Sequence, residues 1–450
     1  MKSRTALLSI VMSLISSHSL RAQENSAQTP RKITLDEAVQ LALKHNHIVR
    51  IAAYKVEEKQ HSKEVAKSAY FPILRNDSSL LQLTDTQFIE IPAGSIGVVG
   101  GTALPATPVI LNQGGRTLVT SGTSLTQPLG ELWKIKPAND IAAAELKATR
   151  GREHQTENEV ALRVHQIYYG ILITQAHREA ALAKIQASED LKSERLAQVK
   201  FGSTLEEEAI ESRAQALEAK QDLLSTELRL SDLTMQLDDA IGLPLSTALT
   251  LDPGVREVSD ICERAACLRV AFESHPEIAE ARAEVEKASA AVRLAKRQYV
   301  PDVEAFARYS YSDNVPFLAR NFGTFGVHFG YDLFDGGRRR AAIEEHEAQL
   351  AQAKENLARV KEDVELRVQT AYNKLERTRE MVSVSSELLA LRTESHRVST
   401  QQLQEGAALR SQVDAAAAHE LDARALLLQS QLDFIQARDE MTEAMGQTPE

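Results

Sequence analysis

The sequence has few aromatic residues (5%), only two cysteines and a net charge of −11. No basic stripe is visible along the chain, which argues against a nucleic acid as its partner. The apolar content of 43% comes mostly from Ala, Leu and Val. With 450 residues, the chain is long enough for more than one domain. Its composition suits long helices with small-residue seams better than a compact globule.

No run of 18 apolar residues follows the N-terminal segment. A transmembrane helix is therefore not expected, and any contact with a membrane must be made by strands. The N-terminal segment itself has the pattern of an export signal. Lys2 and Arg4 supply positive charge, residues 6–20 are apolar with serines, and Ala22 offers a small residue for cleavage. We expect residues 1–22 to be a signal peptide that directs the chain out of the cytoplasm.

No catalytic or metal-binding set of side chains stands out. His45 and His47 lie two residues apart, so they face different ways on a helix. Cys262 and Cys267 either pair in an oxidising periplasm or stay reduced as partly buried thiols, and both alternatives remain open. His275 is the only histidine near them, which argues against a metal site. We expect a protein that is not an enzyme and has no cofactor or metal.

Proline is absent from the stretch Arg338–Met445, and glycine occurs there once, as Gly406. Its main residues are strong helix formers, and apolar or small residues recur in steps of three, four and seven. This stripe consists of Leu350, Ala353, Leu357, Val360, Val364, Val368, Ala371, Leu375, Val382 and Leu389. A helix over residues 338–404 would be roughly 100 Å long. A second periodic run follows, so we expect a helical hairpin with Gly406 at its tip and its arms packed as in a coiled coil.

The chain also contains an internal duplication. The Tyr-x-Pro sequence at Tyr70 recurs at Tyr299. Gly202 recurs as Gly406 at a smaller offset, and this second offset holds over about 80 residues without a gap. A fixed offset of this kind indicates one unit present twice. The change in offset places about 25 extra residues in the first copy, within residues 72–160.

Each copy is expected to contain a helix ended by Tyr-x-Pro, a two-strand region and a long helical hairpin. The first repeat covers residues 23–242 and the second covers 263–447, with a linker at 243–262. The expected elements are helices at 35–68 and 263–298, strands at about 73–129 and 302–334, and hairpins at 139–241 and 338–445.

The strands of the second copy, expected at 303–311 and 325–333, alternate apolar and polar residues over a length suited to crossing a membrane. Apolar positions expected to face lipid are Val303, Ala307, Tyr309, Tyr311, Phe325, Phe329 and Tyr331, and polar positions expected to face a lumen are Arg308, His328 and Asp332. The alternative is a half-buried hairpin in a soluble domain. The first copy alternates poorly at 80–91 and 118–129, and its Gly- and Pro-rich residues 94–108 are expected to form a long exposed loop.

Four strands cannot close a barrel, and open strand edges cannot lie in lipid. If these strands span a membrane, several chains must pool them. Three chains of four strands each would supply twelve strands and a matching set of twelve helical rods. Closure therefore favours a trimer.

These features together resemble the TolC-type outer-membrane efflux proteins. The resemblance extends from Ile33 to Gln447. It rests on the opening Ile33-Thr-Leu-Asp-Glu-Ala-Val-Gln-Leu-Ala-Leu, on Ala69-Tyr-Phe-Pro, on Tyr331-Asp-Leu-Phe-Asp-Gly-Gly-Arg338 and on the run through Gly406 to Met445-Gly446. It implies a mainly α fold with a small β part, in which long helical hairpins form a trimeric α-barrel and four strands per chain enter a transmembrane β-barrel. It also implies a homotrimer in the outer membrane that contacts lipid, reaches into the periplasm and works with a periplasmic adaptor (membrane fusion) protein and an inner-membrane transporter.

In that family, acidic residues near the start of the return helix narrow the periplasmic mouth. Counting from the tip glycines, the matching positions are Glu208 and Glu211 in the first copy, but Gln412 and Ala415 in the second, with Asp414 beside the latter. The resemblance thus implies a periplasmic gate of Glu208, Glu211 and Asp414. The alternative is that acidic residues here only favour a helix N-terminus.

The hairpin tips are expected to be the periplasmic ends that dock the adaptor. The residues concerned are Phe201, Gly202, Leu205, Gly406 and Leu409. The glycines allow the chain to reverse, and the leucines are expected to be exposed apolar contacts.

A further set is expected at the membrane rim. Arg338, Arg339 and Arg340 begin a helix, where the helix dipole disfavours them, so an anionic partner such as lipid phosphate is suspected. Trp133 lies at the matching place in the first copy, and tryptophan is typical of membrane interfaces.

The sequence therefore predicts an outer-membrane channel-tunnel that passively conducts substrates exported by a pump and an adaptor, as in tripartite efflux or type I secretion. The alternative is a periplasmic coiled-coil scaffold that never enters the membrane. The cargo is left open among drugs, metal ions and secreted protein.

Overall fold

The computed structural model describes residues 31–86, 88–112, 114–245, 247–252, 262–315 and 318–449. The expected signal peptide and residues 253–261 of the expected linker lie outside these ranges. Among the described residues, no helix has both the length and the apolar character needed to cross a membrane.

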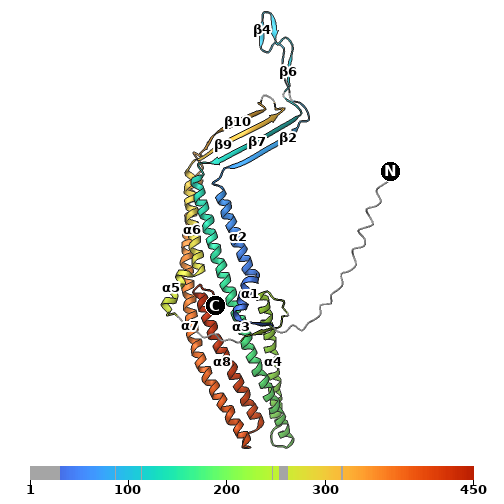
Figure 1. The fold of residues 1–450 in the computed structure, drawn as a ribbon, viewed down its shortest axis with the longest axis vertical. Coiled ribbons are helices and arrows are strands. Elements are labelled where there is room, and N and C mark those ends of the chain that lie inside the picture. The colour runs from blue at the N-terminus through green and yellow to red at the C-terminus, as the bar shows by residue number, and fades with distance from the viewer. Residues whose placement is uncertain are drawn as a thin grey trace, which may run out of the picture. The chain divides into compact units, whose positions relative to one another are not determined.

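The fold is mainly α with a small β part, as expected (Figure 1). The helices are α1 (Leu35–His45), α2 (His47–Ser68), α3 (Leu132–Lys200), α4 (Glu206–Ile241), α5 (Arg264–Ser274), α6 (Pro276–Lys296), α7 (Arg338–Gln404) and α8 (Arg410–Ala444), with a short 3-10 helix η1 (Arg297–Tyr299). The strands are β1 (Arg31–Ile33), β2 (Ile73–Gln82), β3 (Phe88–Ile91), β4 (Gly97–Val99), β5 (Thr102–Leu104), β6 (Val109–Asn112), β7 (Thr117–Pro128), β8 (Leu249–Leu251), β9 (Asp302–Asp313) and β10 (Asn321–Gly330).

The chain divides into two compact units, and each takes segments from both repeats. Unit 1 consists of Met1–Ala42, Val164–Glu257 and Leu389–Leu428, and unit 2 consists of Leu43–Arg163, Val258–Leu388 and Gln429–Glu450. The long helices α3, α7 and α8 therefore contribute a segment to each unit.

The first helix of each repeat is broken once, so the expectation of continuous helices over 35–68 and 263–298 is wrong. In the first repeat, Asn46 has an extended backbone, and its side-chain oxygen accepts a hydrogen bond from the N–H of Ile48 at 2.9 Å. This side chain satisfies an N–H that has no partner inside the helix. A new helix, α2, therefore starts directly after it.

The matched break in the second repeat is made by His275. Its Nδ1 accepts a hydrogen bond from the N–H of Glu277 at 3.2 Å, and Pro276 occupies the first position of α6. Burial lowers the pKa of His275 to about 4. The ring is therefore neutral near pH 7 and keeps the lone pair that caps the helix.

The long helix of the first repeat begins at Leu132, seven residues before the expected start, with Pro137 in its second turn. Proline has no N–H, so the carbonyl four residues earlier, that of Trp133, loses its helical partner. The Arg297 guanidinium donates a hydrogen bond to this carbonyl. A side chain distant in sequence thus allows the helix to continue through the proline.

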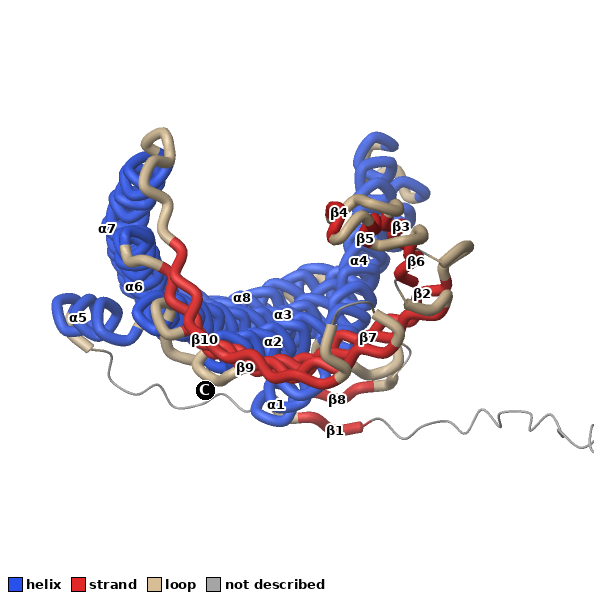
Figure 2. The backbone as a smooth tube through the Cα atoms, turned by 90° about the horizontal axis from the view of Figure 1, so that it is seen from above, coloured by secondary structure: helices blue, strands red, loops and turns tan. Residues whose placement is uncertain are grey.

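Unit 2 contains a four-stranded antiparallel sheet with the order β10-β9-β7-β2. Both hairpins thus join in one sheet, with β7 beside β9 and with β10 and β2 as its outer strands. Figure 2 shows the strands following one continuous curve. β9 and β10 cover 302–313 and 321–330, which corrects the expected 303–311 and 325–333.

The extra residues of the first copy are not the expected loop. β3 pairs with β6 and β4 pairs with β5, so residues 88–112 form two short β ribbons. β2 ends at Gln82 and β7 begins at Thr117, so both long strands of the first copy lie within the expected 73–129.

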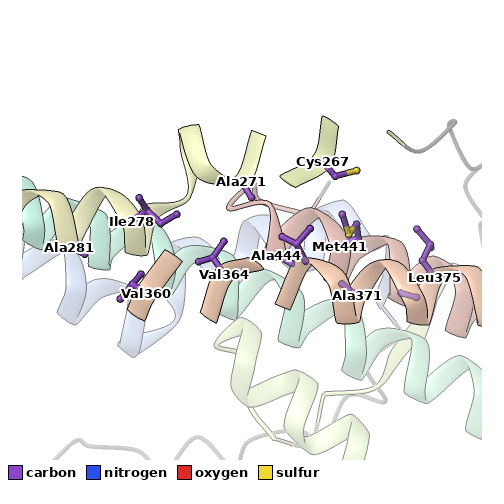
Figure 3. Close-up of a cluster of buried hydrophobic side chains, with 12 residues drawn as sticks. Cys267, Ala271, Ile278, Ala281, Val360, Val364, Ala371, Leu375, Met441 and Ala444 are labelled. Atoms are coloured by element: carbon purple, nitrogen blue, oxygen red, sulfur yellow. The ribbon is translucent and has the colours of Figure 1, made fainter. Parts of the chain in front are cut away.

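Unit 2 has a core of small and branched side chains from α5, α6, α7 and α8 (Figure 3). It consists of Cys267, Ala271, Ile278, Ala281, Val360, Val364, Val368, Ala371, Leu375, Ala437, Met441 and Ala444. The part of the expected stripe from Val360 to Leu375 is buried here, which confirms the helical periodicity. Cys262 and Cys267 form a disulfide bond beside this core, which decides between the two alternatives for these cysteines.

Unit 1 contains a two-stranded parallel sheet in which Ile33 of β1 is paired with Leu251 of β8. The buried Tyr168 holds the ends of both strands. Its hydroxyl lies 3.1 Å from the carbonyl of Ile33 and 2.9 Å from the carbonyl of Asp252, and it accepts a hydrogen bond from the N–H of Asp252. Burial raises the pKa of Tyr168 to about 12, so the hydroxyl keeps its proton for donation.

Replacement of Tyr168 by Phe is expected to lower the free energy of unfolding by about 1–3 kcal/mol, because buried backbone groups lose their partner. Thermal unfolding of the detergent-solubilised protein, followed by circular dichroism, measures this. Tyr54→Phe, which removes the hydroxyl of an exposed tyrosine, is the control. Equal effects of the two substitutions would contradict the role assigned to Tyr168.

Candidate functional site

One face of the sheet is apolar and uncovered in the single chain. Cross-strand partners share a face, and the register pairs Phe325 with Ala307, Val327 with Ala305 and Phe329 with Val303. The exposed fractions of Phe325, Val327 and Phe329 are 89%, 65% and 65%. Strand alternation puts Arg308 on the opposite face, where the absence of a side chain at Gly122 makes room for its guanidinium.

In the first copy this face is apolar only in part, in line with the poor alternation of its sequence. The register sets Leu125 beside Ala307 and Leu74 beside Leu125. Polar residues on the same face bond to one another: the Asn76 amide donates to Thr123 at 2.8 Å, and Ser78 bonds to Ser121 at 2.8 Å. Paired polar groups cost far less to remove from water than unpaired ones, so these positions are compatible with an apolar surrounding.

The five residues expected as a lipid-facing belt do not share one environment. Phe325 and Phe329 are exposed, and Tyr309 is exposed while its hydroxyl donates to Asn321 at 3.2 Å. Tyr311 is half-buried beneath the Arg320 guanidinium.

Tyr331 is the exception within this belt, because β10 ends one residue before it. The Arg339 guanidinium lies 5.1 Å from its ring centroid. Tyr331 therefore belongs with the start of α7, and its assignment to the strand is corrected.

The expected rim residues are largely paired within the chain. Arg339 is buried and forms an ion pair with Asp335 at 2.5 Å, so a lipid contact for this residue is wrong. Arg338 pairs with Asp332 at 3.1 Å, but both side chains are exposed. Arg340 pairs with a glutamate one turn further along α7 and is also exposed. Trp133 has an exposed fraction of 64%.

Both hairpin tips have the same backbone geometry. Gly202 and Gly406 have φ angles of 70° and 74°, a region that L side chains rarely adopt. At matched positions, the N–H of Ser203 bonds to the carbonyl of Gln198 at 3.0 Å, and the N–H of Ala407 bonds to a carbonyl at 2.8 Å. These bonds close the ends of α3 and α7 in the manner of a Schellman motif.

The tips expose apolar side chains, although they lie at the ends of long polar helices. Phe201, Leu205 and Leu409 have exposed fractions of 86%, 69% and 48%.

The two glutamates of the expected gate lie at the start of α4 and are exposed. Glu208 forms an ion pair with Arg195 of α3 at 3.0 Å and accepts a hydrogen bond from Thr204 at 2.7 Å. Glu211 accepts a hydrogen bond from Gln215. In the second copy, Gln412 folds back to accept the N–H of Leu409 at 3.1 Å, so it caps its own helix.

The third expected gate residue has different surroundings. Asp414 faces Asp190 of α3, and its side chain is only 25% exposed. Burial and the hydrogen bond with Asp190 raise the pKa of Asp414, while Arg410, at 3.7 Å, opposes the shift. The two carboxyl groups therefore meet between α3 and α8 of one chain.

In unit 1, contacts establish the order of the helical rods as α4-α3-α8-α7. Lys184 of α3 pairs with Asp222 of α4 at 2.7 Å, Asp190 meets α8 as described, and His396 of α7 pairs with Glu420 of α8 at 2.6 Å. Figure 2 shows the four helices in the same order. α4 and α7 are thus the outer rods.

Each outer rod carries a row of positions spaced alternately three and four residues apart, as in a coiled-coil seam. On α4 the row is Ile210, Ala214, Leu217, Gln221, Leu224, Leu228, Ser231 and Met235, and on α7 it is Met381, Val384, Leu388, Leu391, Ser395, Val398 and Gln402. We call these rows the α4 seam and the α7 seam. Leu217, Leu224 and Leu391 have exposed fractions of 61%, 66% and 64%. The seams are therefore uncovered in the single chain.

Comparison with known proteins agrees with this geometry. Residues 267–447 match the family model described as outer membrane efflux protein. A search of the curated proteins gives no match.

Solved structures match nearly the whole chain. The CmeC outer membrane channel of Campylobacter jejuni is 13% identical with a TM-score of 0.75, covering 92% of this chain and 85% of its own. The outer membrane protein VceC of Vibrio cholerae is 17% identical with a TM-score of 0.71, covering 92% of this chain and 97% of its own. The MtrE outer membrane channel of Neisseria gonorrhoeae is 14% identical with a TM-score of 0.71, covering 92% and 89%.

The chain has the fold of these outer-membrane channels, and the resemblance stated from the sequence is confirmed. Its residues 267–447 are similar to the outer membrane efflux protein family.

If the apolar sheet face contacts lipid, Val327→Arg near mid-membrane is expected to cost roughly 2–4 kcal/mol. Single cysteines, labelled with a membrane-impermeant reagent, test the assignment directly. Cysteines at Val327 and Phe325 should resist labelling, whereas cysteines at Arg308 and His328 should react through the lumen. Strong labelling of the first pair together with protection of the second would contradict this assignment of the two faces.

Because its pKa is raised on folding, Asp414 contributes stability that is fully present below about pH 3.9 and is lost as the pH rises through its folded pKa. Asp414→Asn should therefore raise the thermal unfolding temperature at pH 7, and this gain should shrink as the pH falls to about 4. Asp422→Asn, at an exposed position of α8, is the control. A gain of the same size at both pH values would contradict the account.

Proposed function

We propose that three copies of this chain assemble into a duct that passively conducts substrates across the outer membrane and the periplasm. An inner-membrane pump would supply the energy, and a periplasmic adaptor would join it to the duct. The observation that carries the proposal is that the chain is incomplete on both sides: β2 and β10 are outer strands, and α4 and α7 are outer rods with exposed seams.

The sheet supports a membrane location only as part of a closed ring. Among the described strands, each outer strand has one row of N–H and C=O groups without a strand partner, and such groups cannot remain unpaired in lipid. Pairing β10 of one copy with β2 of the next would satisfy both rows. Three copies would then give a barrel of twelve strands, an even number within the range known for such barrels.

The seams support the same assembly in the helical part. The number of residues from Gly202 to Ile210 equals the number from Val398 to Gly406. Leu217 and Leu391 are likewise equally far from these two tips. If the tips of neighbouring copies are level, α4 of one copy and α7 of the next run antiparallel with their apolar positions side by side. Covering large exposed residues in this way contributes roughly 1.5–3 kcal/mol for each leucine that becomes fully buried.

The duct proposal assigns the remaining surfaces. Phe201, Leu205 and Leu409 at the tips would dock the adaptor, since they are apolar and exposed. Glu208 and Glu211 would line the periplasmic mouth, where three copies bring six carboxylates together. Asp414 would lie outside this ring of carboxylates, because its side chain faces Asp190 of the same copy.

Membrane fractionation tests the duct against a periplasmic scaffold. The protein should stay in the outer-membrane fraction after washes with high salt and with carbonate, and the purified protein should form conducting pores in planar bilayers. Release by the washes together with the absence of pores would favour the scaffold and reject the duct.

The seam contact gives a sharper prediction about assembly. With cysteines at Leu217 and Leu391 of the same chain, oxidation should link neighbouring copies into covalent trimers, because the two positions meet across the interface. The control pairs the Leu217 cysteine with one at the exposed Arg392, which is turned about 100° away on α7. Equal linking of both variants would contradict the proposed pairing.

At the mouth, replacing Glu208 and Glu211 by Gln should reduce the cation selectivity of pores in planar bilayers and weaken block by divalent cations. The reason is that the carboxylates attract cations to a narrow opening. Glu206→Gln, at an exposed position of the same turn facing another way, is the control. Conductance, selectivity and block identical to those of the unmodified protein would show that the two residues only support the helix start.

A further inference from the structure

The two ribbons within residues 88–112 form an arm that the proposed duct does not use. The arm lies beyond the end of β2 and β7 that is away from the helices α2 and α3 (Figure 1). At its base, the N–H of Leu83 bonds to the carbonyl of Arg116 at 2.7 Å, and Arg116 pairs with Asp85 at 3.7 Å. Between Phe88 and the end of β6, the only charged residue is Glu90.

One face of the β3–β6 ribbon is wholly apolar. The register pairs Ile89 with Leu111 and Ile91 with Val109, and these four side chains lie on the same face. Ile89, Leu111 and Val109 have exposed fractions of 45%, 40% and 38%. The opposite face carries the sole charge, Glu90, together with Phe88 and Ile110, whose exposed fractions are 61% and 65%.

The β4–β5 ribbon adds further exposed apolar side chains in the outer part of the arm. Ile96, Val98 and Val99 have exposed fractions of 76%, 68% and 69%. If nothing bound the arm, all of these apolar groups would be exposed to water. Clustered apolar groups of this kind usually mark an interaction surface.

Lipid is a poor occupant for this surface. β3 and β6 pair only with each other among the described strands, so both have an open backbone edge. Open edges cannot be satisfied in hydrocarbon. The binding partner of the arm must cover the apolar side chains and leave the strand edges in contact with water or with other strands. A protein surface can do both.

A second copy fits this requirement. In the proposed trimer, the three arms leave equivalent sheets at the same end, so they are held together at high effective concentration. The near absence of charge removes repulsion between copies and offers no charge pattern for recognising a foreign protein. Twelve strands spaced about 4.8 Å apart and tilted by about 40° enclose a radius of roughly 12 Å. β3 alone, at Phe88–Ile91, spans on the order of 13 Å, which is about the distance from the barrel wall to its axis.

We propose that the apolar face of Ile89, Ile91, Val109 and Leu111 packs against the arms of the neighbouring copies and forms an extracellular cap over the duct. This inference rests on the proposed trimer. The cap would narrow the outer mouth, while the tips and the glutamate ring control the periplasmic one.

The test uses full-length protein in outer-membrane vesicles, with a single added cysteine and a short bis-maleimide cross-linker. The native cysteines are already joined to each other. Cysteines at Ile89 and at Val109 should give covalent dimers in several-fold higher yield than a cysteine at Glu90, because Glu90 lies on the other face of the same ribbon. All three variants are first checked for the native mass of the unmodified assembly.

The outcomes separate the two proposals. An assembly that is not a trimer would overturn the proposed function and the cap together. A trimer in which Ile89, Val109 and Glu90 cysteines cross-link equally, or not at all, would overturn the cap alone. Cross-linking to a different protein would assign the surface to that partner, and labelling of the arm by a reagent dissolved in the membrane would assign it to lipid. Either result would also overturn the cap.

Discussion

A β-strand edge must find a hydrogen-bonding partner when it is removed from water, and most features of this chain depend on that constraint. The four-stranded sheet has β2 and β10 as its outer strands, and its apolar face carries Phe325, Val327 and Phe329. An apolar face favours lipid, whereas open edges forbid it. Only an assembly that joins the edges meets both conditions, and the proposed trimer does so with identical contacts repeated around one axis.

The helical rods are subject to a similar constraint, in which exposed apolar side chains, and not backbone groups, need a partner. Inside the chain, α7 and α8 pack through alanines such as Ala371 and Ala437 together with branched residues such as Val364. On the outer rods the seams carry larger residues, including Leu217 and Leu391, that remain exposed. Alanines and branched residues are thus covered within a copy, while several large apolar residues of the seams are left for contacts with other copies. This division gives each copy a stable core and a reason to assemble.

Much of the fold follows from local chemistry that the sequence displays directly. Gly202 and Gly406 predicted the tips, because both turns need a positive φ angle. The burial of Val360 to Leu375 followed from helical periodicity. The early start of α3 was not predictable, because it depends on Arg297, distant in sequence, bonding to the carbonyl freed by Pro137. The breaks at Asn46 and His275 had a local signal in their capping side chains, but a strong helical pattern on both sides concealed it.

Part of the candidate site was also predictable, because it depends on local chemistry. Side chains at the tips have few neighbours, so the exposure of Phe201 and Leu205 could be expected from the turn alone. Arg339 looked like a free cation because its ion pair with Asp335 depends on how the chain enters α7. The seams are visible as spacing in the sequence, but spacing does not tell which rods are outermost. That information came from the contacts of α3 with α4 and of α7 with α8.

We propose that the chain reaches a closed structure only as three copies. Sedimentation equilibrium of the detergent-solubilised protein, with the solvent density matched to the detergent, measures the protein mass of the complex directly. The account predicts one species with three times the mass of the mature chain, unchanged on dilution. A complex with the mass of one or two copies, or with four, would contradict it.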